Sequence, residues 1–352
     1  MAARVLGIDL LRIAAMFMVV TLHVLGPGAV FESIPRNTAS WYLGMLFLAE
    51  NTCAVDMFMM ASGWLLVTKR PNFARLLELG LQTYFVSFVM RAGASAYAAA
   101  HGGGGGGVVS WSWFFSDFWY WNAYVSVFLL SPFLNEGLRT AAADKNGTRR
   151  TWFLLAATAI AVSCLPLKVE GEESGYSVAW MVVCYLFGGW IRLSVPQIRR
   201  KRDLFCIETG ALALPAVQLA VWQALRMAGF GVPRCLQSYQ SPFVLCCAAC
   251  HLAFFANLPL KRLPGLLKWA STVSFGVYLF HMQGIARQIL FGGRFAWIGK
   301  TRFPALVPLS WCAALCVYAI CGLLDSARAR LFDLIGVRKI CNRFFPKPGR
   351  TA

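Results

Sequence analysis

The sequence predicts an all-α integral membrane protein, a bundle of about ten transmembrane helices with both termini in the cytoplasm. Three observations indicate this fold class: a hydrophobic composition, apolar segments long enough to cross a bilayer, and basic residues concentrated in alternate connections. Hydrophobic residues make up 58% of the 352-residue chain and charged residues 14%, and the mean hydropathy is +0.59. Soluble domains carry about 25% charged residues, so this composition is typical of a membrane protein.

The net charge of +18 would indicate a nucleic-acid partner in a soluble protein. Here the Lys and Arg residues lie in short segments between apolar runs, which is the pattern of charges that orient helices in a membrane. We therefore expect contacts with membrane lipids and no nucleic-acid partner.

Ten candidate spans follow one another along the chain. In order they cover residues 5–26, 41–67, 76–99, 118–135, 152–167, 177–194, 204–225, 241–258, 269–290 and 305–324. The first is interpreted as a retained helix and not as a secretory signal, because Asp9 and Arg12 interrupt its apolar region and no small-residue cleavage site follows.

The basic residues of the connections predict the topology. With the amino terminus inside, 22 of the 33 Lys and Arg residues fall in inner segments and seven in outer segments, and the remaining four lie in or at the ends of spans. This split follows the positive-inside rule and predicts a multi-pass protein of the plasma membrane with both termini cytoplasmic.

Two regions are expected: a ten-helix membrane domain over residues 1–324 and a basic cytoplasmic tail over residues 325–352. The tail mixes Arg and Lys with Leu, Ile and Phe. A short amphipathic helix on the anionic inner leaflet and a disordered basic tail are both compatible with this composition.

The 12 cysteines are expected to pack as small apolar residues, because most of them fall within spans. The one cluster, Cys246-Cys247-x-x-Cys250, lacks a second pair at the spacing of a zinc site. His251 beside it is expected to point to another face of the helix. We therefore predict no metal site.

Three ionisable residues share one face of the first span. On a helix, Asp9, Arg12 and His23 lie within about 60° of one another, and Arg12 and His23 are about 16 Å apart along the axis. Ionisable groups inside a membrane are costly and mark functional sites. The alternative is structural: an arginine that extends to the interface and a histidine satisfied by a neighbouring helix.

Four segments together resemble the acyltransferase-3 family of integral membrane acyltransferases, which includes O-acetyltransferases of lipopolysaccharide, peptidoglycan and exopolysaccharide. Residues 9–23 carry D-x-x-R followed by R-x10-H, and residues 55–65 (VDMFMMASGWL) are similar to V-D-x-F-F-x-x-S-G-F-L. Residues 118–134 begin FWY and end LSPFL, and residues 275–281 read FGVYLFH, again similar to family motifs. The chain departs from the family at Arg75, where a second arginine three positions later is replaced by glutamate.

The resemblance implies a membrane enzyme, expected to transfer an acyl group, chiefly acetyl, from a cytosolic acyl-CoA to a hydroxyl of a cell-surface glycan or lipid-linked saccharide. Acyl-CoA is then a substrate, and no further cofactor is expected. His23 is the expected general base or transient acyl carrier, since imidazole accepts protons near neutral pH. Arg12, Asp9 and Arg75 are expected at the donor, and for Arg12 the alternative to binding the donor phosphates is a structural pair with Asp9.

Asp56 in the second span is a candidate to orient His23, as a carboxylate orients histidine in hydrolase triads. The alternative is a buried ion pair with Arg287 or Arg91. The acceptor is expected near His281, Tyr278, Trp119 and Tyr120. For His281 an interhelical hydrogen bond is the alternative, and for Trp119 and Tyr120 it is an interfacial aromatic belt.

A second class of function uses the same residues. In a transporter or flippase, Asp9, Arg12, His23 and Asp56 would bind or relay a substrate across the membrane without acyl-CoA. A membrane scaffold without turnover is the third alternative. Consumption of a thioester separates the enzyme from both.

Overall fold

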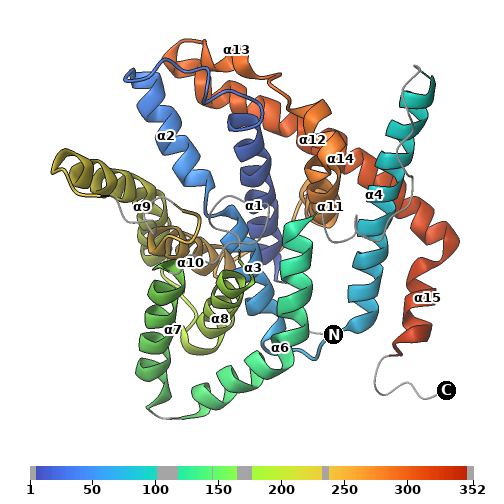
Figure 1. Cartoon of the computed structure of the whole chain (residues 1–352). Helices are drawn as coiled ribbons and strands as arrows, with labels where there is room; N and C mark the ends of the chain where they lie inside the picture. The colour runs from blue at the N-terminus through green and yellow to red at the C-terminus, as the bar shows by residue number, and fades with distance from the viewer. Residues whose placement is uncertain (1–4, 101–117, 145, 165–176, 232–237, 347–352) are drawn as a thin grey trace.

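The computed structural model describes residues 5–100, 118–144, 146–164, 177–231 and 238–346. Over these residues the chain is helical and contains no strand, as the sequence predicts (Figure 1). The helices are α1 Leu6–Leu25, α2 Ala39–Asn51, α3 Ala54–Leu66, α4 Phe73–Ala100, α6 Trp119–Ala143, α7 Gly147–Cys164, α8 Val178–Ser194, α9 Lys201–Met227, α10 Pro242–Ala256, α11 Gly265–Met282, α12 Gly284–Leu290, α13 Ala296–Gly299, α14 Leu306–Ile335 and α15 Val337–Phe344, with a 3-10 turn at Phe303–Ala305.

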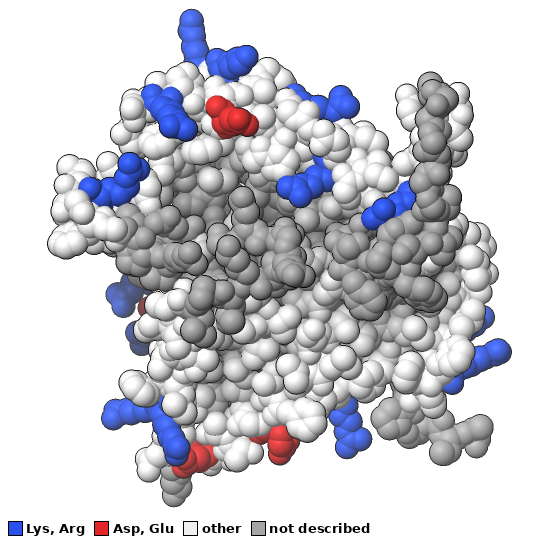
Figure 2. Space-filling model, in the orientation of Figure 1, with Lys and Arg blue, Asp and Glu red and all other residues white. Residues whose placement is uncertain are grey.

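Four helical stretches of the described chain are long and apolar enough to cross a membrane: Leu6–Leu25, Ala39–Leu66, Lys201–Met227 and Phe303–Ile335. Two shorter apolar helices, α8 and α10, accompany them. In the view of Figure 2 most Lys, Arg, Asp and Glu side chains lie toward the upper and lower ends of the molecule. These features give the protein its membrane character, whereas the number of crossings and their direction remain predictions.

Helix α1 lies inside the bundle, in contact with α2, α3, α10, α11 and α14. In its most apolar window 61% of the residues are buried, against 17% for α9, which lies at the periphery (Figure 1). Gly7 permits the closest approach: a Cβ there would lie 1.7 Å from the carbonyl oxygen of Phe255 on α10. The polar residues of α1 are therefore held in the interior of the fold.

Helices α3 and α8 make the most extensive contact between helices of the described chain. A Cβ on Gly63 would lie 2.0 Å from the carbonyl oxygen of Tyr185, and one on Gly188 would lie 2.0 Å from that of Met60. Small residues let helix backbones approach in this way inside membranes. The Ser62-Gly63 pair thus serves helix packing at Gly63.

The carboxyl end of α3 is capped by side chains of α6 and α8. Asn135, Arg139 and Arg192 donate hydrogen bonds of 3.1, 2.9 and 2.7 Å to carbonyl oxygens of its last turn. The acceptors are, in the same order, Leu66, Val67 and Trp64. Cationic and amide donors there satisfy carbonyls that lack partners within the helix and complement its dipole.

The second predicted span is interrupted, although the sequence predicts one continuous helix over residues 41–67. Consecutive side chains bond back to carbonyls of the preceding turn: Asn51 to Phe47 at 2.6 Å, Thr52 to Leu48 at 2.9 Å and Cys53 to Glu50 at 3.4 Å. Such bonds compete with the helical ladder and bend helices. The helix is interrupted here, between the end of α2 and the start of α3.

The last long helix, α14, continues to Ile335, so it crosses the expected boundary between the membrane domain, which ends at residue 324, and the basic tail, which starts at residue 325. Asp325 is buried within it, at 2% exposure. After a left-handed turn at Gly336 the chain forms α15, which packs against α4 through the buried residues Val337 and Cys341. The helical alternative for the tail is therefore realised over these residues.

Candidate functional site

A cavity of about 790 Å³ opens within the bundle. Its walls come from helices α1, α3, α4, α6, α11 and α14, with single contributions from α2 and α12. The polar and aromatic members of the wall are Arg12, His23, Phe58, Ser62, Arg75, Glu78, Gln82, Trp119, Tyr120, Tyr124, Tyr239, Thr272, Ser274, Phe275, Tyr278, Arg287, Arg328, Phe332 and Asp333. Six of the nine residues predicted from the sequence to form the site line this one cavity.

The cavity follows α1 along much of its length, because both Arg12 and His23 line it. Eleven residues of helix separate them, about 16 Å along the axis. Arg12 Nη2 donates to Ser274 Oγ of α11 at 3.3 Å. Asp9 does not line the cavity; it is buried and its Oδ1 accepts a hydrogen bond from Ser271 Oγ at 3.1 Å. Asp9 thus fixes α1 against α11 about one helical turn before Arg12.

Three further arginines line the cavity: Arg75 on α4, Arg287 on α12 and Arg328 on α14. Arg75 pairs with Glu78 at 2.9 Å, and Arg328 with Asp325 at 2.7 Å. Asp325 also accepts a hydrogen bond of 3.0 Å from Gln82. Arg328 is not among the site residues predicted from the sequence, because it falls in the expected tail. The i,i+3 spacing of Asp325 and Arg328 in an extended last helix would have indicated it.

The two histidines predicted for the site lie side by side, with ring centroids 5.0 Å apart. His23 Nδ1 lies 2.8 Å from the carbonyl oxygen of Val19. A carbonyl only accepts, so Nδ1 carries the proton and Nε2 carries the lone pair. His281 repeats this arrangement with Val277. His281 is fully buried and does not line the cavity, so only His23 is open to a substrate.

The aromatic residues predicted for the acceptor gather on one wall. Trp119, Tyr120 and Tyr278 line the cavity, and the rings of Tyr120 and Tyr278 meet edge to face with centroids 5.8 Å apart. Tyr278 also contacts His281, at 6.4 Å between centroids. Tyr124, one helical turn after Tyr120, extends the same wall. The expected acceptor residues are therefore close to His23.

Asp56 is buried at 2% exposure and does not line the cavity. Its Oδ1 accepts a hydrogen bond of 3.1 Å from Trp180 Nε1 on α8. The orientation of His23, for which Asp56 was the candidate, is given by the Val19 carbonyl. Among the described residues Asp56 has no ion pair with Arg287 or Arg91. The structure thus connects Asp56 to the α3–α8 interface.

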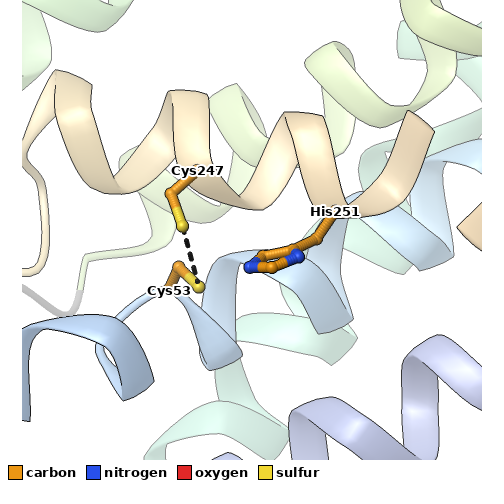
Figure 3. A group of neighbouring side chains, drawn as sticks. All are labelled: Cys53, Cys247 and His251. Atoms are coloured by element: carbon orange, nitrogen blue, oxygen red, sulfur yellow. Dashed lines mark hydrogen bonds between the residues drawn. The ribbon is translucent and has the colours of Figure 1, made fainter. Parts of the chain in front are cut away.

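One expectation about the cysteines is wrong. His251 was expected to point to a different helix face from the cysteine cluster, but Cys247 and His251, four residues apart on α10, share a face. Both lie against Cys53 at the start of α3 (Figure 3). Residues spaced by four are neighbours on a helix surface, and the helix break at Cys53 brings the third side chain to them.

One comparison with known proteins gives a match. The family model of the acyltransferase-3 family, described as an acyltransferase domain, matches residues 5–325. No curated protein and no solved structure gives a significant match. The matched range contains nearly all of the cavity wall and ends three residues before Arg328.

Proposed function

The chain belongs to the acyltransferase-3 family, and on that premise we propose that it transfers an acyl group, chiefly acetyl, from cytosolic acyl-CoA to a hydroxyl of a cell-surface glycan or lipid-linked saccharide. The observation that carries the proposal is that one cavity is lined both by Arg12, Arg75 and Arg328 and by His23. An acyl-CoA has the matching shape and charge, with phosphates at one end and a thioester at the end of a long, thin arm.

The arginines provide the donor site. Guanidinium groups bind phosphate oxygens through charge-assisted hydrogen bonds, often two at a time. With its nucleotide held by Arg75 and Arg328, the pantetheine arm passes Arg12 and brings the thioester to His23. Asp9 supports Arg12 through Ser271 and α11. Arg75 and Arg328 keep their geometry through Glu78 and Asp325.

His23 provides the base. Its Nε2 takes the proton of the acceptor hydroxyl as the hydroxyl oxygen bonds to the thioester carbonyl carbon. The tetrahedral intermediate then collapses, the carbon–sulfur bond breaks, and the CoA thiolate recovers the proton from the imidazolium. Tyr120, Tyr278 and Trp119 form the neighbouring wall, where an acceptor sugar would stack and form hydrogen bonds. The His281 ring packs against the His23 ring. Asp56 accepts a hydrogen bond from Trp180 and so holds α3 against α8.

Topology completes the proposal. The loop charges support an orientation with both termini and the arginine end of the cavity on the cytoplasmic side of the plasma membrane and the histidine end toward its outer face. A reporter that is active only in the cytoplasm, fused after Ala352, should be active. A silent reporter on a well-expressed protein would overturn this orientation and with it the cytosolic donor.

The decisive experiment measures thiol release and acyl transfer from acetyl-CoA by the purified protein in detergent. His23→Ala should abolish both, whereas Thr158→Ala, on the exposed face of α7, should leave them unchanged. Equal activity in the His23 variant would refute the catalytic assignment.

A transporter or flippase remains the second candidate, because the polar cavity extends along α1. It predicts flux of a substrate into vesicles without acyl-CoA. Substrate flux that is independent of acyl-CoA, combined with no thiol release by folded wild-type protein, would favour it over the enzyme.

A further inference from the structure

Three metal-ligating side chains meet away from the cavity, at the break between α2 and α3. Cys53 precedes α3, and Cys247 and His251 lie on α10; their ligand atoms lie within 4.8 Å of one another (Figure 3). All three are buried, at 1%, 1% and 5% exposure. The two sulfur atoms are 3.5 Å apart. None of these residues lines the cavity or takes part in the proposed reaction.

The two nitrogens of His251 have different surroundings. Nδ1 is 3.1 Å from a carboxylate oxygen of Glu208 on α9. Nε2 is buried and has no hydrogen-bond partner among the described residues. The ring points its free edge toward the two cysteines (Figure 3). A carboxylate on one nitrogen and an unused lone pair on the other is the arrangement of a metal-ligating histidine with its supporting carboxylate.

A protonated His251 beside the Cys247 sulfur is the alternative to a metal ion. An imidazolium would carry a proton on Nε2 and would require an acceptor for it. The nearest carboxylate oxygen, Glu50 Oε1 on α2, is 3.7 Å away, beyond hydrogen-bond distance. A cation at the centre of the cluster would use the Nε2 lone pair, both sulfurs and the Glu50 oxygen together.

We propose that Cys53, Cys247, His251 and Glu50 bind a structural Zn²⁺ ion, with Glu208 orienting His251. Two sulfurs and one imidazole nitrogen are a ligand set that zinc prefers. With Zn–S bonds of about 2.3 Å, a tetrahedral site separates its sulfurs by about 3.8 Å, close to the 3.5 Å observed. Zn–N and Zn–O bonds of about 2.0 Å require about 3.3 Å between Nε2 and the carboxylate oxygen, against 3.7 Å observed.

Charge balance favours zinc in this environment. Each thiol releases a proton when it binds the metal, so one Zn²⁺ replaces two protons and leaves the net charge of the cluster unchanged. Four protein ligands leave no open position, as in structural zinc sites. The ion would tie the broken α2–α3 segment to α10 and, through Glu208, to α9. The site therefore stabilises the fold and is independent of acyl transfer.

The test is metal content together with cobalt spectroscopy on the full chain, purified in detergent without chelator. Wild-type protein should contain about one zinc ion per chain. Exchange for Co²⁺ should produce a thiolate-to-cobalt charge-transfer band, since only a bound thiolate gives that transition. Cys247→Ser should lose the zinc and the band. Cys250→Ser, on the same helix but outside the cluster, should keep both.

A second variant tests whether misfolding, and not loss of a ligand, causes the loss of zinc. His251→Asn preserves a polar side chain, and it should reduce zinc content as strongly as Cys247→Ser while the protein stays monodisperse. Folded wild-type protein with no zinc, no cobalt band after loading, or a Cys53–Cys247 disulfide would overturn the proposal. Zinc that is retained equally in Cys247→Ser and in wild type would also overturn it, because the ion would then lie elsewhere.

Discussion

His23 and His281 face each other with ring centroids 5.0 Å apart and bind the chain in the same way, each using Nδ1 to reach the carbonyl oxygen four residues earlier in its own helix. Both rings are thereby fixed in the tautomer that leaves Nε2 as acceptor. They differ in access, because His23 lines the cavity and His281 does not. One histidine is placed to meet substrates, and the other is placed to hold it there.

Substituting each histidine separately should therefore distinguish the catalytic role of His23 from the positioning role of His281. His23→Gln should lower kcat for acyl transfer by about 100-fold or more, the contribution typical of a general base. His281→Gln should lower kcat about tenfold and leave the acceptor KM unchanged, because its ring packs on His23 outside the cavity. Steady-state kinetics with varied acceptor measure both. A raised acceptor KM in His281→Gln would instead support the acceptor role that the sequence predicts.

Substitution of Arg75 should change the KM only for acyl donors that carry the nucleotide. Arg75→Gln should raise the KM for acetyl-CoA about tenfold, the loss expected for one charge-assisted hydrogen bond. It should leave the KM for acetyl-pantetheine, which lacks the nucleotide phosphates, unchanged. Initial rates with the two donors give the comparison.

Arg150→Gln is the matched control, since this exposed residue at the start of α7 does not line the cavity. Equal losses with both donors in Arg75→Gln would contradict phosphate binding and would indicate damage to the packing of α4.

Much of the site was predictable because its residues repeat along one helix. The positions of Asp9, Arg12 and His23 follow from helical geometry alone, and the structure places Arg12 and His23 on one cavity. The surroundings of Asp56 and Cys53 were not predictable. Asp56 meets a tryptophan 124 positions away, and Cys53 meets a cysteine 194 positions away. Such contacts depend on which helices pack together, and periodicity within one span carries no information about that.

The α3–α8 contact should be intolerant of any side chain at Gly63. Gly63→Ala places a methyl group 2.0 Å from the Tyr185 carbonyl oxygen, so the helices must separate. Overpacking of this kind costs about 1–3 kcal/mol of unfolding free energy. Thermal denaturation in detergent, followed by the fraction remaining monodisperse, reports the loss.

The control for that measurement is Gly137→Ala on α6, where an added Cβ meets no atom within 4 Å. It should be neutral or stabilising by up to about 1 kcal/mol, since alanine favours the helix over glycine. If the two variants denature at the same temperature, the close approach of α3 and α8 is not a feature of the folded protein.

Asn135 should contribute more to stability than its charged neighbour. Its amide donates to the Leu66 carbonyl at the end of α3 and accepts from the Tyr185 hydroxyl at 2.9 Å, with 1% of the residue exposed. Asn135→Ala removes both bonds in a buried place and should lower the free energy of unfolding by about 1–3 kcal/mol. Glu136→Gln removes only the ion pair with Arg139, whose carboxylate partner is 72% exposed, and exposed pairs contribute about 0–1 kcal/mol. Thermal denaturation of the two variants in detergent compares their stabilities. If Glu136→Gln denatures at the lower temperature, the hydrogen bonds at the end of α3 do not hold α3, α6 and α8 together.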